Sequence, residues 1–124
     1  MLHNEDVTQI IIAAAMEVHR HLGPGLLESA YEECMCRELA LRETPYASQV
    51  ALPLEYKGIK LDCGYRMDLV VNDLVVVELK CVDKVLPIHE AQLLTYLKLS
   101  RIKTGLIINF NTPLLKDGIR RLVL

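Results

Sequence analysis

The sequence predicts an α/β fold of three layers, α/β/α, built around a small mixed sheet. Two helices open the chain, and three strands then follow one another with no helix between them. A further helix leads into a short strand that is apolar throughout, which is typical of a strand covered on both faces. This succession of elements favours a sheet with helices on each side.

The two N-terminal helices are predicted from the spacing of apolar residues. Residues 4–21 carry such side chains on one helical face: Val7, Ile10, Ile11, Ala14, Ala15 and Val18. The segment 22–25, Leu-Gly-Pro-Gly, ends this helix because glycine and proline interrupt helices. A second helix is expected over residues 26–41, with glutamates in its first turns that suit the positive end of the helix dipole.

Three strands are expected next, at residues 48–56, 59–71 and 74–80. Apolar and polar residues alternate in the first strand. Pro53 places that strand at an edge or beside a bulge, because proline donates no ladder hydrogen bond. Lys57-Gly58 predicts a two-residue turn between the first and second strands.

The remaining elements complete the sheet. Asn72-Asp73 separates two runs rich in valine and leucine, so it predicts a tight turn between antiparallel strands. A helix over residues 88–100 then connects the third strand to an apolar strand at 104–110. A right-handed crossover would place this helix on the face opposite the N-terminal helices. Residues 118–124 are expected to add a last strand.

Three ionisable residues lie at one end of the hairpin formed by the second and third strands. With the turn at residues 72–73, Asp68 comes opposite Glu78, to within one or two residues. Lys80 lies two residues beyond Glu78 and so shares its face of the strand. Burying such charges costs several kcal/mol each unless they are paired or bind a metal. The sequence therefore predicts either an ion pair from Lys80 to one acid or a bound cation.

Composition limits the remaining choices. A chain of 124 residues with 52% apolar residues is expected to form a single domain over residues 1–124. The longest apolar run near the N-terminus, residues 10–16, is far too short to span a bilayer, and no basic signal-peptide head precedes it. We therefore expect a cytoplasmic protein with no membrane partner. The net charge of −2 gives no overall basic field for nucleic acid, and the four cysteines, which lack zinc-type spacing, are expected to be reduced and mostly buried.

The charged hairpin carries a known signature. Asp68 followed after nine residues by Glu78-Leu79-Lys80 resembles the D-x(n)-E-x-K pattern of the PD-(D/E)XK nuclease superfamily, whose core order is αβββαβ. Met67 stands where the superfamily's name has proline, a position that is commonly degenerate. Gln92 and Tyr96, on the following helix, resemble the Q-x-x-x-Y element of its RecB-like branch. The resemblance implies a restriction-endonuclease-like core.

A second motif lies upstream. Residues 25–32, GLLESAYE, are similar to the motif that names the GxxExxY proteins, a small branch of the same superfamily. With this motif the resemblance covers residues 19–124. Three motifs occurring in the right order on the expected elements are far more specific than any one of them alone.

The resemblance implies phosphodiester hydrolysis assisted by Mg²⁺ or Mn²⁺, both of which take oxygen ligands. Asp68 and Glu78 would ligate the cation, with the Leu79 carbonyl as a third ligand. Glu28 would complete the acidic cluster. Lys80 would hold or help to deprotonate the attacking water, and its ammonium would stabilise the developing negative charge.

The supporting residues each allow a plainer interpretation. Glu28 suits a first helical turn for electrostatic reasons alone, and Glu32 either faces solvent or assists it. Tyr31 is as well explained by core packing as by a role in a site. Gln92 and Tyr96 are neighbours at i, i+4 that would reach Lys80 or a substrate phosphate, or simply belong to an amphipathic helix.

Two functions follow from the sequence. The first is a metal-dependent nuclease acting on nucleic acid, DNA rather than RNA. The second is a catalytically idle module for nucleic-acid binding or protein assembly that retains the fold. A specific protein–DNA contact usually buries over ~1,000 Å² of protein, which is difficult for a chain of this size, so a homodimer would favour the first function.

Overall fold

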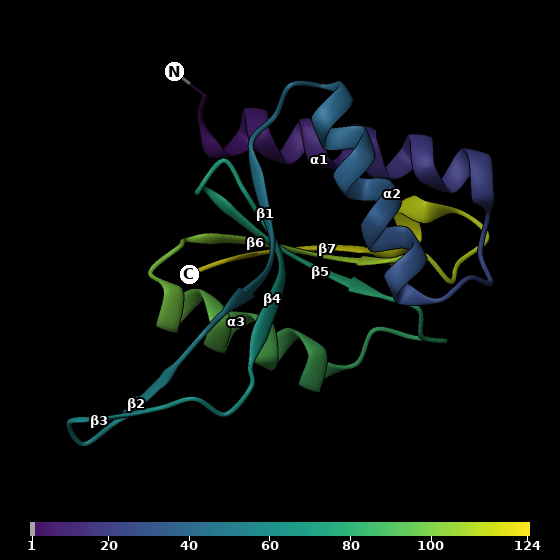
Figure 1. Ribbon diagram of the computed structural model, residues 1–124. Helices are drawn as coiled ribbons and strands as arrows, with labels where there is room; N and C mark the ends of the chain where they lie inside the picture. Colours follow the sequence, from purple (N-terminus) through teal and green to yellow (C-terminus); the bar gives the residue numbers. More distant parts are fainter. Residues whose placement is uncertain (1) are drawn as a thin grey trace.

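The computed structural model describes residues 2–124 and shows a five-stranded sheet with helices on both faces (Figure 1). Helices α1 (Asn4–Leu22) and α2 (Glu28–Leu41) pack on one face of the sheet, and α3 (Pro87–Ser100) packs on the other. The predicted α/β/α fold is therefore confirmed, with each helix within two residues of its expected bounds.

The five-stranded sheet is mixed and has the order β1-β4-β5-β6-β7. Its central strands β5 and β6 are parallel and are joined through α3, whereas the other neighbours are antiparallel. A 3₁₀ turn, η1 (Leu115–Gly118), precedes the last strand. The five strands are β1 (Tyr46–Ala51), β4 (Arg66–Val71), β5 (Val75–Lys80), β6 (Thr104–Asn109) and β7 (Ile119–Val123).

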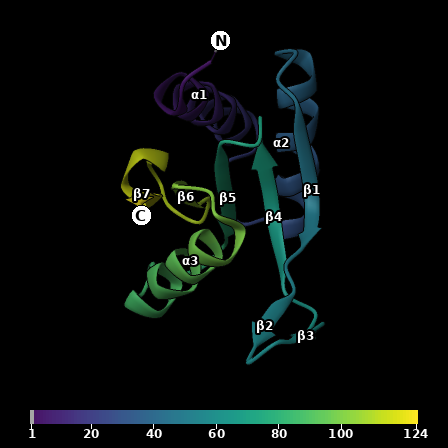
Figure 2. The ribbon, with the colours of Figure 1, turned by 90° about the vertical axis from the view of Figure 1, so that its left-hand side faces the viewer.

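The strands predicted at 48–56 and 59–71 are each broken in two. Their far halves form β2 (Leu54–Tyr56) and β3 (Ile59–Leu61), a separate two-stranded sheet that projects beyond the main sheet (Figure 2). Pro53 interrupts the first strand because it has no amide hydrogen, and Gly64, with φ of 78°, interrupts the second. The second strand is thus completely interrupted between Leu61 and Arg66. We call residues 54–61 the arm.

Each face of the sheet has its own apolar core. On β5, Val75, Val77 and Leu79 pack towards α1 and α2, while Val76 packs towards α3. Every residue of β6 is buried, which confirms the prediction of a strand covered on both faces. Burial of a valine or leucine side chain contributes roughly 1.5–3 kcal/mol, so these two cores hold β5 and β6 rigidly at the centre of the molecule.

The cysteines are more exposed than the sequence predicts. All four cysteines are free thiols, but Cys63 is exposed and the others are only half-buried, so the expectation of mostly buried thiols is wrong. No helix within residues 2–124 is long and apolar enough to cross a membrane.

Candidate active site

Asp68 and Glu78 lie at the point where β4 and β5 separate. The last regular pair of the two strands is Leu69 with Val77, and beyond it side chains replace the backbone ladder. The Asp68 amide donates a hydrogen bond to Glu78 Oε2 at 2.9 Å, and the Leu79 amide donates one to Asp68 Oδ2 at 2.9 Å. Each carboxylate therefore binds the backbone of the opposite strand, which fixes the two acids next to one another.

Burial makes this pair of acids difficult to ionise together. Glu78 is only 6% exposed, and its burial, followed by the charge of Asp68, raises its pKa to about 8. Burial also raises the pKa of Asp68, opposed by the Leu79 amide and the charge of Lys80. The pair therefore retains a proton at neutral pH, which a nearby divalent cation would displace.

Lys80 lies near both acids without forming an ion pair with either. It is half-buried at the end of β5, and its positive charge opposes the upward shift in the pKa of Asp68 and of Glu78. Within residues 2–124, the ion pairs all involve other residues. The alternative of a Lys80 salt bridge is thus not formed in the structure, and the ammonium keeps its hydrogens for another acceptor.

Glu28 reaches the same strand end from α2. As the first residue of that helix, it accepts a hydrogen bond from the Cys81 amide at 3.2 Å, just beyond β5. The loop before α2 is held by Tyr31, whose hydroxyl donates to the Gly23 carbonyl at 2.5 Å and accepts from the Leu26 amide at 3.2 Å. Tyr31 is fully buried, so it anchors the loop that presents Glu28 and belongs to the core.

An open cavity of about 360 Å³ lies against Asp68, whereas Glu78 and Lys80 do not line it. Its lining residues come from α2, β1, β4 and β5: Glu28, Ser29, Glu32, Gln49, Asp68 and Leu79. The Gln49 amide nitrogen donates to Glu32 Oε1 at 2.7 Å and lies 3.5 Å from Asp68 Oδ1. Glu32 therefore faces this cavity together with Glu28, as its position one helical turn further on allows.

Gln49 has no signal in the sequence that marks it as a site residue. It lies in a polar stretch of an edge strand and belongs to no motif, so no pattern distinguishes it from its neighbours. Glu32 carried a usable signal, because Glu28 and Glu32 are four residues apart on one helix and share a face.

Gln92 and Tyr96 approach from the opposite face of the sheet, on α3. Gln92 Nε2 donates to Tyr96 Oη at 3.0 Å, and the Tyr96 ring contacts that of Tyr65 edge-on at 6.3 Å. Burial raises the pKa of Tyr96, the Gln92 hydrogen bond opposes this, and the charges of Glu78 and Asp68 add to the rise. Tyr96 is therefore close to the acidic pair, although among the described residues it makes no hydrogen bond to Lys80.

The donor atoms at this strand end suit a hard divalent cation. Two carboxylates, a backbone carbonyl at Leu79 and a third carboxylate at Glu28 offer only oxygen, the donor that Mg²⁺ and Mn²⁺ prefer. No three His, Cys, Asp or Glu side chains within residues 2–124 are close enough together to form a complete metal site. Mg²⁺ usually keeps several waters and takes one or two carboxylates, so the residues present fit such an ion.

A mixed sheet with helices on both faces and a pair of acids, buried Glu78 and half-buried Asp68, beside a lysine defines a restriction-endonuclease-like domain. Comparison with protein families matches residues 5–122 to the PD-(D/E)XK nuclease superfamily, and the chain belongs to this superfamily. No curated protein and no solved structure matches the chain.

Proposed function

We propose that this protein is a Mg²⁺- or Mn²⁺-dependent nuclease that hydrolyses phosphodiester bonds, in DNA rather than RNA. The observation that carries the proposal is the pair formed by half-buried Asp68 and buried Glu78, in which each acid is bonded to the opposite strand. Burial raises the pKa of both acids, and a divalent cation would reverse that shift. Nothing else in the described fold requires two acids at this position.

Each residue has a defined part in this proposal. Asp68, Glu78 and the Leu79 carbonyl hold the cation, and Glu28 supports it from α2. The bound cation would activate water and neutralise negative charge on the phosphate. Lys80 orients the attacking water through its ammonium and stabilises the charge that develops on the phosphate oxygens.

Gln92 and Tyr96 extend the site on the α3 side. Their mutual hydrogen bond fixes the side chains as one unit, which leaves the second amide hydrogen of Gln92 and the hydroxyl hydrogen of Tyr96 available to a phosphate oxygen. In this proposal they position the substrate and take no part in moving protons.

We also propose that the chain belongs to the GxxExxY branch. The support is that each residue of that motif has a physical task here. Gly25 adopts a φ of 103°, Glu28 reaches the strand end, and Tyr31 anchors the loop between α1 and α2.

The second candidate is an idle module for nucleic-acid binding or protein assembly. It is favoured by the absence of a complete metal site within residues 2–124 and by the net charge of −2. A homodimer remains a prediction based on the size of the chain, and sedimentation of the purified protein tests it.

Cleavage of labelled single- and double-stranded DNA, and of RNA, with Mn²⁺ or Mg²⁺ tests the nuclease proposal. Asp68→Asn and Lys80→Ala are each expected to reduce cleavage at least ~100-fold. Asp73→Asn is the matched control, because this acid lies exposed in the turn of the same hairpin and should leave cleavage unchanged. Cleavage that persists in both site variants would refute the site, whereas a wild type that neither cleaves nor binds Mn²⁺ would favour the idle module.

A further inference from the structure

One residue within a strand has a backbone conformation that side chains rarely adopt. Gln49, in β1, has φ of 50°. Five other residues besides glycine have positive φ among those described, and all lie in turns or next to helix ends: Glu43, Lys57, Asn72, Asp73 and Arg101. A left-handed residue other than glycine costs free energy and persists only where its surroundings hold it.

The strand pairing places this residue beside the acidic pair. On either side of it, Ser48 pairs with Leu69 and Val50 pairs with Met67, so Gln49 lies opposite Asp68. The side chains of β4 also stop alternating regularly between the two faces of the sheet at this point. Met67 packs in the core under α3 and Leu69 in the core under α1 and α2, although the two are only two residues apart.

At this distortion the side chain of Gln49 contacts two acids. Its amide nitrogen is 2.7 Å from Glu32 Oε1 and 3.5 Å from Asp68 Oδ1, so one donor group lies between two acceptors from different elements. Both acids line the cavity described above. Two carboxylates that share a cavity repel each other, and a donor between them reduces that repulsion.

We propose that Gln49 is a positioning residue, whose amide holds Asp68 and Glu32 in place on one wall of the cavity. The left-handed backbone is the device that directs the amide to this point. The inference rests on the proposed function, since it assigns to Gln49 the orientation of an acid that would bind the cation. It adds Glu32 to the site as the second acid held by the same amide.

Two substitutions separate this role from a merely structural one. Gln49→Gly and Gln49→Ala both remove the amide, but glycine accepts positive φ without strain and alanine does not. We therefore expect the glycine variant to have a higher midpoint of thermal unfolding than the alanine variant. Both should lose 10- to 100-fold in Mn²⁺ affinity and in kcat, as is typical when a residue that orients a ligand is removed.

A third substitution tests the chemistry of the contact. Gln49→Glu keeps the length of the side chain but replaces the donor with an acceptor, so a third carboxylate faces Asp68 and Glu32. We expect it to reduce kcat at least as much as Gln49→Ala, with KM for DNA within about twofold of the wild type because Gln49 contacts no substrate in this proposal.

The measurements are Mn²⁺ affinity by titration calorimetry, kcat and KM for DNA, and the thermal midpoint. Wild-type Mn²⁺ affinity and kcat in the glycine variant would overturn the inference while leaving the nuclease proposal intact. The inference would also be overturned if the losses of Mn²⁺ affinity and kcat paralleled the loss of thermal stability, so that the glycine variant lost less than the alanine variant. A wild type that neither binds Mn²⁺ nor cleaves DNA would overturn both proposals. Because this result comes from the wild type, it is distinguishable from a failure seen only in the Gln49 variants.

Discussion

Two hairpins of this chain are closed by the same kind of turn, but one is buried and the other is exposed. Two-residue turns with positive φ close both: Asn72-Asp73 in the β4–β5 hairpin, at 53° and 55°, and Lys57-Gly58 in the arm, at 47° and 85°. The β4–β5 hairpin is buried on both faces by helices. The arm is exposed, with Tyr56 and Ile59 opposite each other at 61% and 62% exposure.

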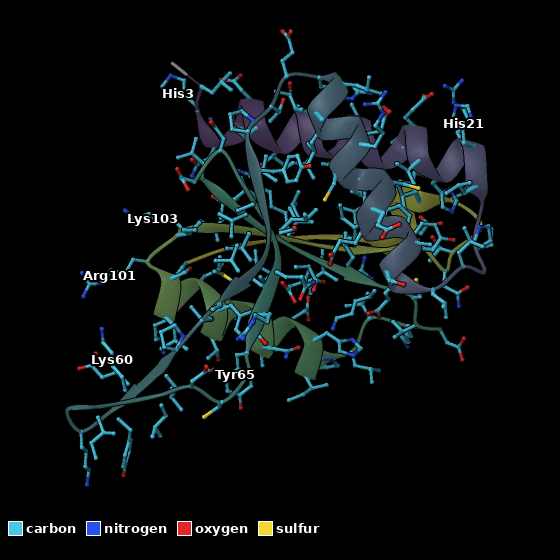
Figure 3. The ribbon with its side chains drawn as sticks, viewed as in Figure 1. His3, His21, Lys60, Tyr65, Arg101 and Lys103 are labelled. Atoms are coloured by element: carbon cyan, nitrogen blue, oxygen red, sulfur yellow. The ribbon has the colours of Figure 1, made fainter. Side chains whose placement is uncertain are left out.

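The difference between the hairpins shows what burial adds to local structure. A cross-strand pair of charged residues occurs in each: Glu55 opposite Lys60 in the arm, and Asp68 beside Glu78 in the core. Figure 3 shows Lys60 on the projecting arm and Tyr65 where the chain returns towards the main sheet. Glu55 and Lys60 are exposed, whereas Glu78 is buried and Asp68 half-buried, so only in the core hairpin is a charge costly to hold and available for a site.

The largest contrast should come from placing a new charge in each hairpin. Val77→Asp buries an unpaired carboxylate in a fully buried position, so we expect a loss of at least ~4 kcal/mol in the free energy of unfolding or no folding at all. Ile59→Asp in the arm should change that free energy by no more than ~0.5 kcal/mol. Urea denaturation measures both, and comparable losses in the two variants would show that the arm is as sensitive to a new charge as the core hairpin.

The dependence of stability on pH should come from the core pair. An unfolded glutamate loses its proton near pH 4.5, whereas folded Glu78 keeps it up to about pH 8. The folded state therefore binds more protons in this window, and the free energy of unfolding should fall as pH rises from about 4.5 to about 8. The fall is expected to be on the order of 5 kcal/mol, because the pKa of Glu78 rises from 4.5 to about 8 and each pKa unit is worth about 1.4 kcal/mol.

Two variants check this prediction by urea denaturation at several pH values. Glu78→Gln should flatten the profile, because glutamine has no proton to lose. Glu55→Gln, which changes an exposed residue of the arm, should leave the profile as in the wild type. A wild-type profile that rises with pH over this window would contradict the assignment.

Divalent cations should stabilise the core hairpin and not the arm. At 100 times its Kd, Mn²⁺ is expected to raise the free energy of unfolding by about 2.7 kcal/mol, because it binds only the folded state. Asp68→Asn should abolish the effect, whereas Asp62→Asn, at the base of the arm, should retain it. Thermal unfolding with and without Mn²⁺ measures the difference.

The smallest contrast lies in the turns themselves. Asp73→Gly relieves a positive φ in the core hairpin and should stabilise the protein by about 0.5 kcal/mol. Lys57→Asn gives the arm a turn residue that tolerates positive φ, but the arm can open without unfolding the core, so global stability should change less. Equal gains in both variants would show that the arm unfolds together with the core.

Much of the fold could be predicted because its signals are local. Residues 4–21 have one apolar helical face, and Asn72-Asp73 lies between two apolar runs, so the first helix and the core hairpin follow directly. The detached arm could not be predicted in the same way. Pro53 indicated an edge or a bulge, but whether a strand bends or breaks depends on which neighbours it pairs with.

Three features can be read directly from the sequence: the order of the elements, the turn that brings Asp68 next to Glu78, and the spacing typical of the superfamily. Those features depend on residues close together in the chain, where periodicity and turn chemistry act. Three features appear only in the folded protein: Gln49 lies between Glu32 and Asp68, Tyr31 anchors a loop from the core, and Glu78 is buried beside half-buried Asp68. These depend on contacts between distant segments and on exclusion of water, neither of which has a local signal in the chain.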